Sequence, residues 1–191
     1  MDFDKIAYNL LNKIVLNSGG NLYRICEVEM YCYSEDHPDL YVHRVEDQKT
    51  NGKFYFHKFS NGTYKAGTFK GLDITYGNEK TYFGVLIRSI LNLKTRELTE
   101  GSCNCVNELI GGVLVKDFMN NFDKIISIDN KDFGLIDYKL PIKPIYHGPR
   151  IGLSDKYPEF KDRNYRYAIY IEHIVKKRKT FKLLVWFTML V

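Results

Sequence analysis

The sequence predicts an α+β fold, a single domain over residues 1–191 with a curved, mostly antiparallel β-sheet and flanking helices. Length is the first reason, because a chain of 191 residues suits one domain that buries about 70% of its unfolded surface. The second reason is pattern. One segment with a helical hydrophobic period is followed by several strand-like segments joined by short turns. No internal repeat, low-complexity tract or long linker divides the chain.

The first segments differ in hydrophobic period. Residues 3–17 carry apolar side chains at helical spacing, and Asn17-Ser18-Gly19-Gly20 ends that pattern. Residues 22–33 alternate and are rich in strand-forming side chains, which predicts a strand. Residues 34–53 contain a proline, several acids and Asn51-Gly52, which indicates a long loop; such loops in compact domains are usually functional or mobile.

The remaining elements follow from turns and composition. Turn sequences at Asn61-Gly62 and Tyr76-Gly77-Asn78 favour a meander of antiparallel strands. The predicted strands are 54–59, 63–76, 81–91, 150–153 and 164–174, with a helix at 103–120 and short strands and loops at 121–149. The final apolar run, TFKLLVWFTMLV, is shorter than the roughly twenty residues of a membrane span, so we expect a closing strand or helix on the core.

Charge and cysteine content limit the classes of function. A net charge of +5 favours a polyanionic partner, although many proteins without such a partner carry a similar charge. The opening MDFDKIAYNLLNKIV lacks the pattern of a secretory signal, so we expect an intracellular protein, in the nucleus or cytoplasm, with reduced cysteines. The spacing Cys103-x-Cys105 and the scattered histidines do not predict a metal site, and no cofactor is expected.

The strand at 22–33 holds the strongest candidate site. Its period of two places Cys26, Val28 and Met30 on one side, and Glu27, Glu29 and Tyr31 on the other. A carboxylate and a phenol ring then project side by side from one rigid element, which suits a flat substrate held over a base. We expect both to lie on the concave, solvent-reachable face of the sheet. From this pattern alone, a half-exposed strand with a polar outer face is the favoured interpretation.

Short motifs here resemble the alkyladenine (3-methylpurine) DNA glycosylase family. RICEVEMY at 24–31 resembles the family's R-I-x-E-T-E-A-Y, and His43, with Thr50 seven residues on, resembles its histidine and threonine after an acidic loop. GVLIRSI at 84–90 is similar to the strand C-V-L-L-R-A-L, and Arg150-Ile151-Gly152-Leu153 with residues 166–168 is similar to R-V-G-V…R-F-Y. The resemblance covers residues 22–51 best, 81–91 next, and 101–112 and 149–170 loosely.

The resemblance implies an enzyme that flips a damaged purine into an aromatic pocket and hydrolyses its N-glycosidic bond. Glu29 would activate the water, and Arg88 would hold charge and geometry around Glu29. Tyr31 and His43 would stack on the base. Other interpretations stay open: Arg88 as a buried structural pair, and His43 as an ordinary loop histidine with His37 as its rival.

Two departures from the family concern substrate binding. The hairpin that carries the family's aromatic wedge is about four residues shorter here, and Tyr64 or Phe69 could replace the wedge. Asp73 stands where the family has the asparagine of M-N-I-S, and an ionised aspartate only accepts hydrogen bonds. A second carboxylate near Glu29 would also raise one of the two pKa values.

We therefore expect a monomeric DNA N-glycosylase of base excision repair, acting on duplex or single-stranded DNA and not on a membrane. The alternatives are a protein that has lost turnover and keeps the pocket for binding, or an enzyme that uses the pocket on a nucleotide or a single strand. For a nucleic-acid ligand, basic residues should surround the pocket mouth: Lys53, Lys58, Lys65, Lys70, Arg150, Lys161 and Arg163.

Overall fold

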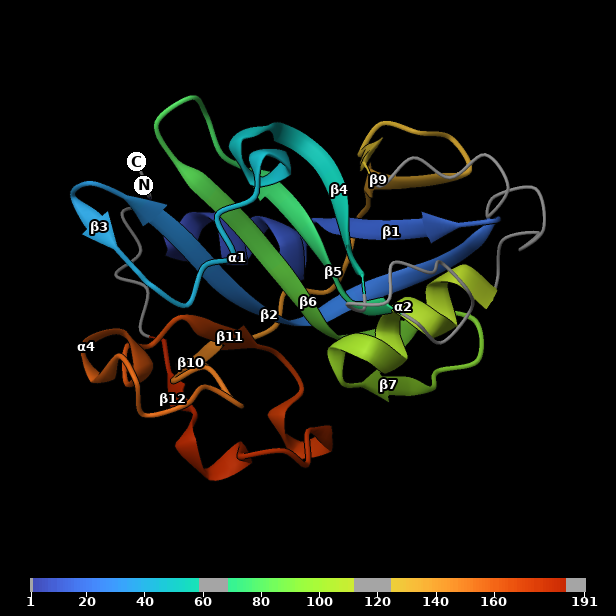
Figure 1. Cartoon of the computed structure of the whole chain (residues 1–191). Helices are drawn as coiled ribbons and strands as arrows, with labels where there is room; N and C mark the ends of the chain where they lie inside the picture. Colours follow the sequence, from blue (N-terminus) through green and yellow to red (C-terminus); the bar gives the residue numbers. More distant parts are fainter. Residues whose placement is uncertain (1, 59–68, 112–124, 185–191) are drawn as a thin grey trace, which may run out of the picture.

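The computed structural model describes residues 2–58, 69–111 and 125–184, and antiparallel pairing joins its strands into one open sheet (Figure 1). The strand order is β12-β10-β11-β2-β6-β5-β4-β8, with β1 and β3 beside β2, β9 beside β1 and β7 beside β6. The strands are β1 Ile14–Ser18, β2 Asn21–Ser34, β3 His37–Pro38, β4 Asn51–Lys58, β5 Phe69–Tyr76, β6 Tyr82–Asn92, β7 Leu98–Glu100, β8 Ile125–Ser127, β9 Phe133–Asp137, β10 Tyr146–Gly148, β11 Arg166–Ala168 and β12 Lys182–Leu183. The helices are α1 Phe3–Asn12, α2 Ser102–Gly111 and α4 Pro158–Lys161, with short 3-10 turns at Glu46–Lys49, Ile171–His173 and Arg178–Thr180. The chain is thus one α+β domain, as the sequence predicts.

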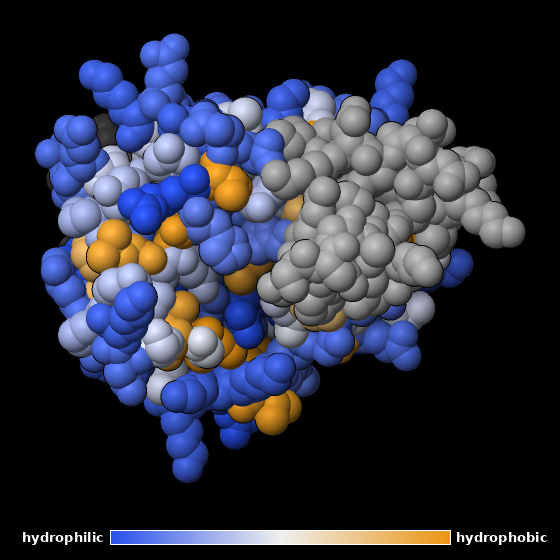
Figure 2. All heavy atoms as spheres, in the orientation of Figure 1, coloured by the Kyte–Doolittle hydropathy of each residue, from blue (hydrophilic) through white to orange (hydrophobic). Residues whose placement is uncertain are grey.

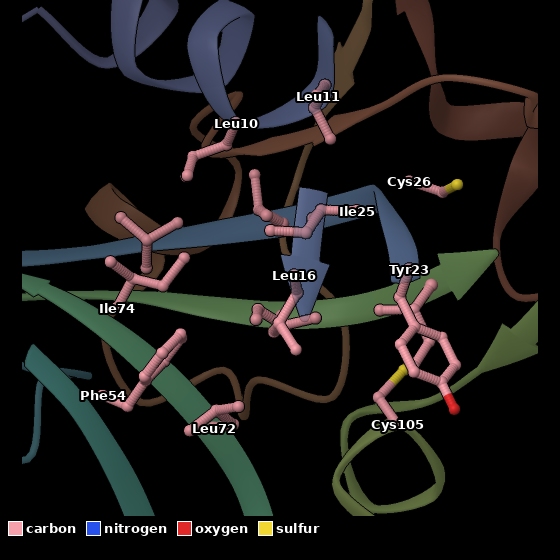
Figure 3. Close-up of a cluster of buried hydrophobic side chains, with 14 of the residues drawn as sticks. Leu10, Leu11, Leu16, Tyr23, Ile25, Cys26, Phe54, Leu72, Ile74 and Cys105 are labelled. Carbon is pink, nitrogen blue, oxygen red and sulfur yellow. The ribbon is translucent and has the colours of Figure 1, made fainter. Parts of the chain in front are cut away.

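The apolar core lies on one face of this sheet, between the strands and two helices. Leu10 and Leu11 of α1 point towards Ile25 of β2, while Phe54 and Leu72 of the neighbouring strands lie across the same layer (Figure 3). Helix α2 adds its buried side chains Cys105, Val106, Leu109 and Ile110. The opposite face of the sheet is therefore left for polar side chains.

The first helix is shorter than the sequence predicts. The side chain of Asp2 caps α1 by accepting a hydrogen bond of 3.0 Å from the backbone N–H of Lys5, and the helix ends at Asn12. Residues 14–17, which the periodicity assigns to the helix, form β1 between β2 and β9. Because this segment is buried and forms backbone hydrogen bonds with a strand on each side, it is a strand despite the helical spacing of its apolar residues. Ile14 and Val15 are β-branched, which also favours a strand.

Other boundaries shift in the same way. The predicted loop at 34–53 contains β3 and a 3-10 turn, and it ends where β4 begins at Asn51. Residues 150–153 are wrongly predicted as a strand: they form a bend after β10, with Gly152 at a φ of 78°. Of the predicted strand at 164–174, only Arg166–Ala168 is a strand. The predicted stretches 63–68 and 112–120, and most of the final apolar run, lie outside the described residues.

The described surface is mainly hydrophilic in the view of Figure 2, with hydrophobic residues scattered between charged ones. Within residues 2–58, 69–111 and 125–184, no helix is long and apolar enough to cross a membrane. The same part of the chain holds the four cysteines as free thiols.

Two β-bulges shape the polar face. The register between β2 and β6 skips Cys26 on β2 and Arg88 on β6. As a result Ile25 and Cys26 both join the core, and Arg88 and Ser89 both lie on the polar face. The sequence Ile87-Arg88-Ser89-Ile90 carries this signal, because two polar residues between apolar ones break the period of two.

Glu27 ties the C-terminal segment to the sheet through a buried ion pair. The Arg166 side chain donates from Nε to Glu27 Oε1 at 2.5 Å and from Nη2 to the carbonyl of Lys176 at 2.9 Å. The hydroxyl of Ser89 donates to the other Glu27 oxygen at 2.5 Å. Because Glu27 and Arg166 are at most 1% exposed, each charge depends on the other for compensation.

Arg166→Ala should therefore lower the free energy of unfolding by about 3–5 kcal/mol, because it leaves the Glu27 carboxylate buried and unpaired. Arg163→Ala is the matched control: Arg163 pairs with exposed Glu159, and its loss should cost about 1 kcal/mol or less. Urea unfolding followed by circular dichroism measures both. An equal loss in the two variants would contradict the role given to Arg166.

Candidate active site

The register of the sheet places the predicted site residues in one row on the polar face. Glu29 of β2 pairs with Leu86 of β6, and Leu86 pairs with Asp73 of β5. Directly opposed residues share a face, so both carboxylates point away from the core. They lie two strands apart, at a backbone separation of about 10 Å, with Leu86 between them.

A cavity of about 370 Å³ opens over this row. Tyr31 and His43, both predicted to hold a base, line it, and so does Asp73. The other lining residues are Tyr41, Gln48, His57, Leu86, Gly152 and Leu153. Aromatic rings beside a few polar groups suit a flat heterocyclic ligand, and the volume suits one ring system of purine size.

Glu29 lies directly beside this cavity and is held by contacts from three segments. Its Oε2 accepts a hydrogen bond of 3.0 Å from the hydroxyl of Tyr31 and one of 3.4 Å from Nη1 of Arg88. Its Oε1 accepts the backbone N–H of Ile151 at 2.9 Å. The period-two prediction is confirmed in direction, because Glu29 and Tyr31 share the face opposite the core.

The prediction that Glu29 is reachable by solvent is wrong, because its exposed fraction is 0%. The bend at 150–153 and the Tyr31 ring cover it. Burial raises the pKa of the Glu29 carboxyl above its ordinary value, while Arg88, the Ile151 N–H and Tyr31 act in the opposite direction. Burial and the charge of Glu29 also raise the pKa of Tyr31, so its hydroxyl keeps the proton that it donates.

A second cavity, of about 480 Å³, is lined by Arg88 and Ile151, two residues that contact Glu29. Gly152, Lys176 and Lys177 complete its lining among the described residues. Gly152 borders both cavities, and Glu29 contacts Tyr31 in one and Arg88 in the other. The carboxylate therefore contacts the lining of both an aromatic cavity and a basic one.

Asp73 belongs to a polar group that the sequence did not reveal. Nε2 of His57 lies 2.9 Å from Asp73 Oδ2, and Nε2 of Gln48 donates to the same oxygen at 3.3 Å. Position 84 must be glycine here, because a Cβ would overlap the Asp73 carboxylate. The sequence led us to expect that Asp73 would raise the pKa of Glu29, but Asp73 is not among the causes of that shift. The like charge that raises the Glu29 pKa is Glu27.

The remaining predicted residues fall into three groups. His43 lies in the aromatic cavity with its ring 5.2 Å from His57, whereas its rival His37 packs on Phe3 and Phe160 elsewhere. Arg88 forms ion pairs with both Glu29 and Glu27. Tyr64 and the side chain of Phe69 lie outside the described residues.

The expected ring of basic residues takes a different form. Arg150 is buried: it pairs with Asp39 at 2.7 Å and lies over the Tyr31 ring at 4.5 Å, so it supports the cavity wall from behind. Lys161 and Arg163 pair with Asp155 and Glu159. Lys53 does not line either cavity, and Lys65 and the side chains of Lys58 and Lys70 lie outside the described residues. Among the described residues, the basic groups that line the second cavity are Arg88, Lys176 and Lys177, and Arg88 contacts Glu29.

Two larger hollows, of about 860 and 820 Å³, lie near the N-terminus and the β2–β3 turn. Their linings include Asp2, Asp4, Asp36, Glu35 and Glu79. These acids disfavour an anionic ligand, although Lys49 and Lys80 also line the second hollow. Of the candidate site residues, His37, the rival of His43, lines the first hollow. Within the described chain, no group of three His, Cys, Asp or Glu side chains could hold a metal ion.

Comparison with known proteins identifies one similar protein of viral origin. No protein-family model matches it. An uncharacterized protein of Acanthamoeba polyphaga mimivirus is 41% identical over 197 residues, which cover 94% of this chain and 91% of the viral protein. The chain belongs to the family of that protein. Because the match omits only a few residues, it spans the segments that line both cavities.

The raised pKa of Glu29 predicts how stability changes with pH. A carboxyl whose pKa is higher in the folded state contributes stability that is complete below its ordinary pKa of 4.5 and lost as pH rises through the folded value. Glu29→Gln removes this titration, so the free energy of unfolding of the variant should rise relative to wild type above pH 4.5, by at most about 1.4 kcal/mol per pH unit. Urea unfolding from acidic to mildly basic pH tests this. A difference that does not change with pH would contradict it.

Proposed function

We propose that this protein is a DNA N-glycosylase that removes a damaged purine with a Glu29-activated water. The observation that carries the proposal is that Glu29 contacts both Tyr31, which lines the aromatic cavity, and Arg88, which lines the basic one. A nucleotide has the same order of parts: a flat base, a sugar with the glycosidic bond, and a phosphate. With the base beside Tyr31 and the phosphate beside Lys177, the glycosidic bond falls next to the carboxylate.

The residues support hydrolysis of the N-glycosidic bond by one water molecule. The oxygen of water forms a bond to the sugar C1′, the bond from C1′ to the purine nitrogen breaks, and its electron pair leaves with the purine. The water proton passes to Glu29, whose raised pKa makes the carboxylate a stronger proton acceptor. The same carboxylate stabilises the positive charge that develops on the sugar.

Arg88 and Tyr31 act on Glu29 as positioning residues in this scheme. Their hydrogen bonds to Oε2, with the Ile151 N–H on Oε1, fix the carboxylate in one orientation. Fixed donors around a reacting carboxylate avoid the cost of reorganisation during the reaction. The likeness to the alkyladenine DNA glycosylase motifs assigns the same roles, which supports the proposal from sequence.

A binding protein without turnover is the second candidate. The observation in its favour is that Glu29 is 0% exposed and engaged by three donors, so a water must enter with the ligand or from the cavity side. A nucleotide-directed or single-strand-directed enzyme would use the same two cavities.

The first test is turnover. Oligonucleotides that carry hypoxanthine, ethenoadenine or an alkylated purine are incubated with the protein, and abasic sites are measured by alkaline cleavage. Glu29→Gln should keep ligand binding, because the side chains are nearly isosteric, and lose about 10²–10⁴-fold in single-turnover rate. Glu79→Gln, at an exposed carboxylate, is the control and should retain the wild-type rate.

Three outcomes separate the candidates. Equal rates for wild type and Glu29→Gln would falsify the role of Glu29. Binding of lesion DNA without cleavage by the wild type supports the binding protein. Cleavage of free nucleotides or single strands, with no action on duplexes, supports the third assignment.

The basic cavity predicts a salt effect on DNA binding. If Lys177 contacts a phosphate, Lys177→Gln should weaken binding of all sequences alike and reduce the slope of log K against log salt by about 1. Lys94→Gln, at an exposed lysine of the β6–β7 turn, should leave that slope unchanged. Fluorescence anisotropy over a salt series measures both, and identical slopes for the two variants count against the phosphate site.

A further inference from the structure

The wall of the aromatic cavity formed by Gln48, His57 and Asp73 has no part in the bond cleavage proposed above. Both Gln48 and Asp73 are 1% exposed. His57 and the Gln48 amide share one Asp73 oxygen, Oδ2. Among the described residues, the other oxygen, Oδ1, and the Gln48 Oε1 have no hydrogen-bond partner and are shielded from water. Two acceptors that belong to cavity-lining residues are thus left unsatisfied.

Chemistry fixes the orientation of the Gln48 amide. A carboxylate accepts hydrogen bonds only, so the NH₂ end of Gln48 must face Asp73, and the carbonyl oxygen is the end left over. The Asp73 carboxylate is in turn fixed by its contacts with His57 and Gln48, while the absence of a Cβ at Gly84 makes room for it. The two unsatisfied acceptors are therefore built into the wall.

The hydroxyl donors of the cavity are already used. The Tyr31 hydroxyl donates to Glu29 at 3.0 Å, and the Tyr41 hydroxyl donates to the carbonyl of Ser154 at 2.5 Å. The wall around Asp73 thus offers acceptors to a ligand, and leaving a buried acceptor unpaired costs free energy. A ligand that fits must bring the N–H donors itself.

We infer that Gln48 and Asp73 select a purine whose edge carries two neighbouring N–H donors, a ring N–H beside an exocyclic amino group, as in guanine. A hypoxanthine ring has the same shape and the ring N–H but lacks the amino group, so it leaves one acceptor unpaired. This selection rests on the proposed function for the delivery of the base into the cavity. It makes Asp73 and Gln48 specificity-determining residues.

The substitution Asp73→Asn tests this directly, because the amide brings a donor where the carboxylate only accepts. Guanosine and inosine are the probes, since they differ only in the 2-amino group. Isothermal titration should give wild-type binding of guanosine that is about 10–100-fold tighter than that of inosine, the range for one hydrogen bond to a charged or buried group. Asp73→Asn should reduce this ratio to near one, and Asp129→Asn, at an exposed aspartate, should leave it unchanged.

Thermal unfolding of each variant confirms that the fold is kept. Gln48→Leu provides a second route, since it removes one acceptor, together with the Gln48 donor to Asp73, and leaves residue 73 an aspartate. Equal affinity of the wild type for both nucleosides, or no binding of either at millimolar concentration, overturns the inference. An unchanged ratio in both Asp73→Asn and Gln48→Leu overturns it as well. A guanosine preference without DNA cleavage supports the inference and counts against the glycosylase. Cleavage of hypoxanthine DNA together with equal affinities for the two nucleosides supports the glycosylase and counts against the inference.

Discussion

Two glutamates, Glu27 and Glu29, project from the same face of β2, and both are buried. Removing a carboxylate from water costs several kcal/mol unless opposite charges and hydrogen-bond donors replace the lost hydration. Strands β2 and β6 do not supply all of these donors, so the C-terminal part of the chain has to lie beside and over β2. Arg166 comes from β11 and the Ile151 N–H from the bend that follows β10. The cover over the polar face, and with it both cavities, depends on this requirement.

The two carboxylates have different hydrogen-bond and ion-pair partners, and this difference indicates a structural role for Glu27 and a chemical role for Glu29. Glu27 has a short ion pair with Arg166 and a hydroxyl donor, and its role is to fasten two segments. Glu29 has longer contacts with Arg88, and burial is the largest influence on its pKa. A buried carboxyl with a raised pKa beside a cavity is a frequent sign of a functional site. The proposed chemistry therefore belongs to Glu29.

The sequence predicts what depends on periodicity along one element. The alternation in β2 placed Glu29 and Tyr31 together, and strand order and turns predicted the antiparallel meander of β4, β5 and β6. It does not predict contacts between distant segments, such as the Ile151 N–H on Glu29 or Lys177 beside Arg88. It also misassigns residues 14–17, because pairing on both sides decides their conformation. His57 carried no signal beyond its place in a strand, yet register puts it next to Asp73.

Leu86 is an apolar residue within a row of polar residues on this face of the sheet. It lies between Glu29 and Asp73 in the register, and it keeps the two carboxylates about 10 Å apart at the backbone. At this separation the charge of Asp73 does not count among the causes of the Glu29 pKa shift. One apolar side chain thus isolates the group that would act on the glycosidic bond from the groups that would read the base. A change at position 73 can then alter which ligand fits while the carboxylate at position 29 keeps its environment.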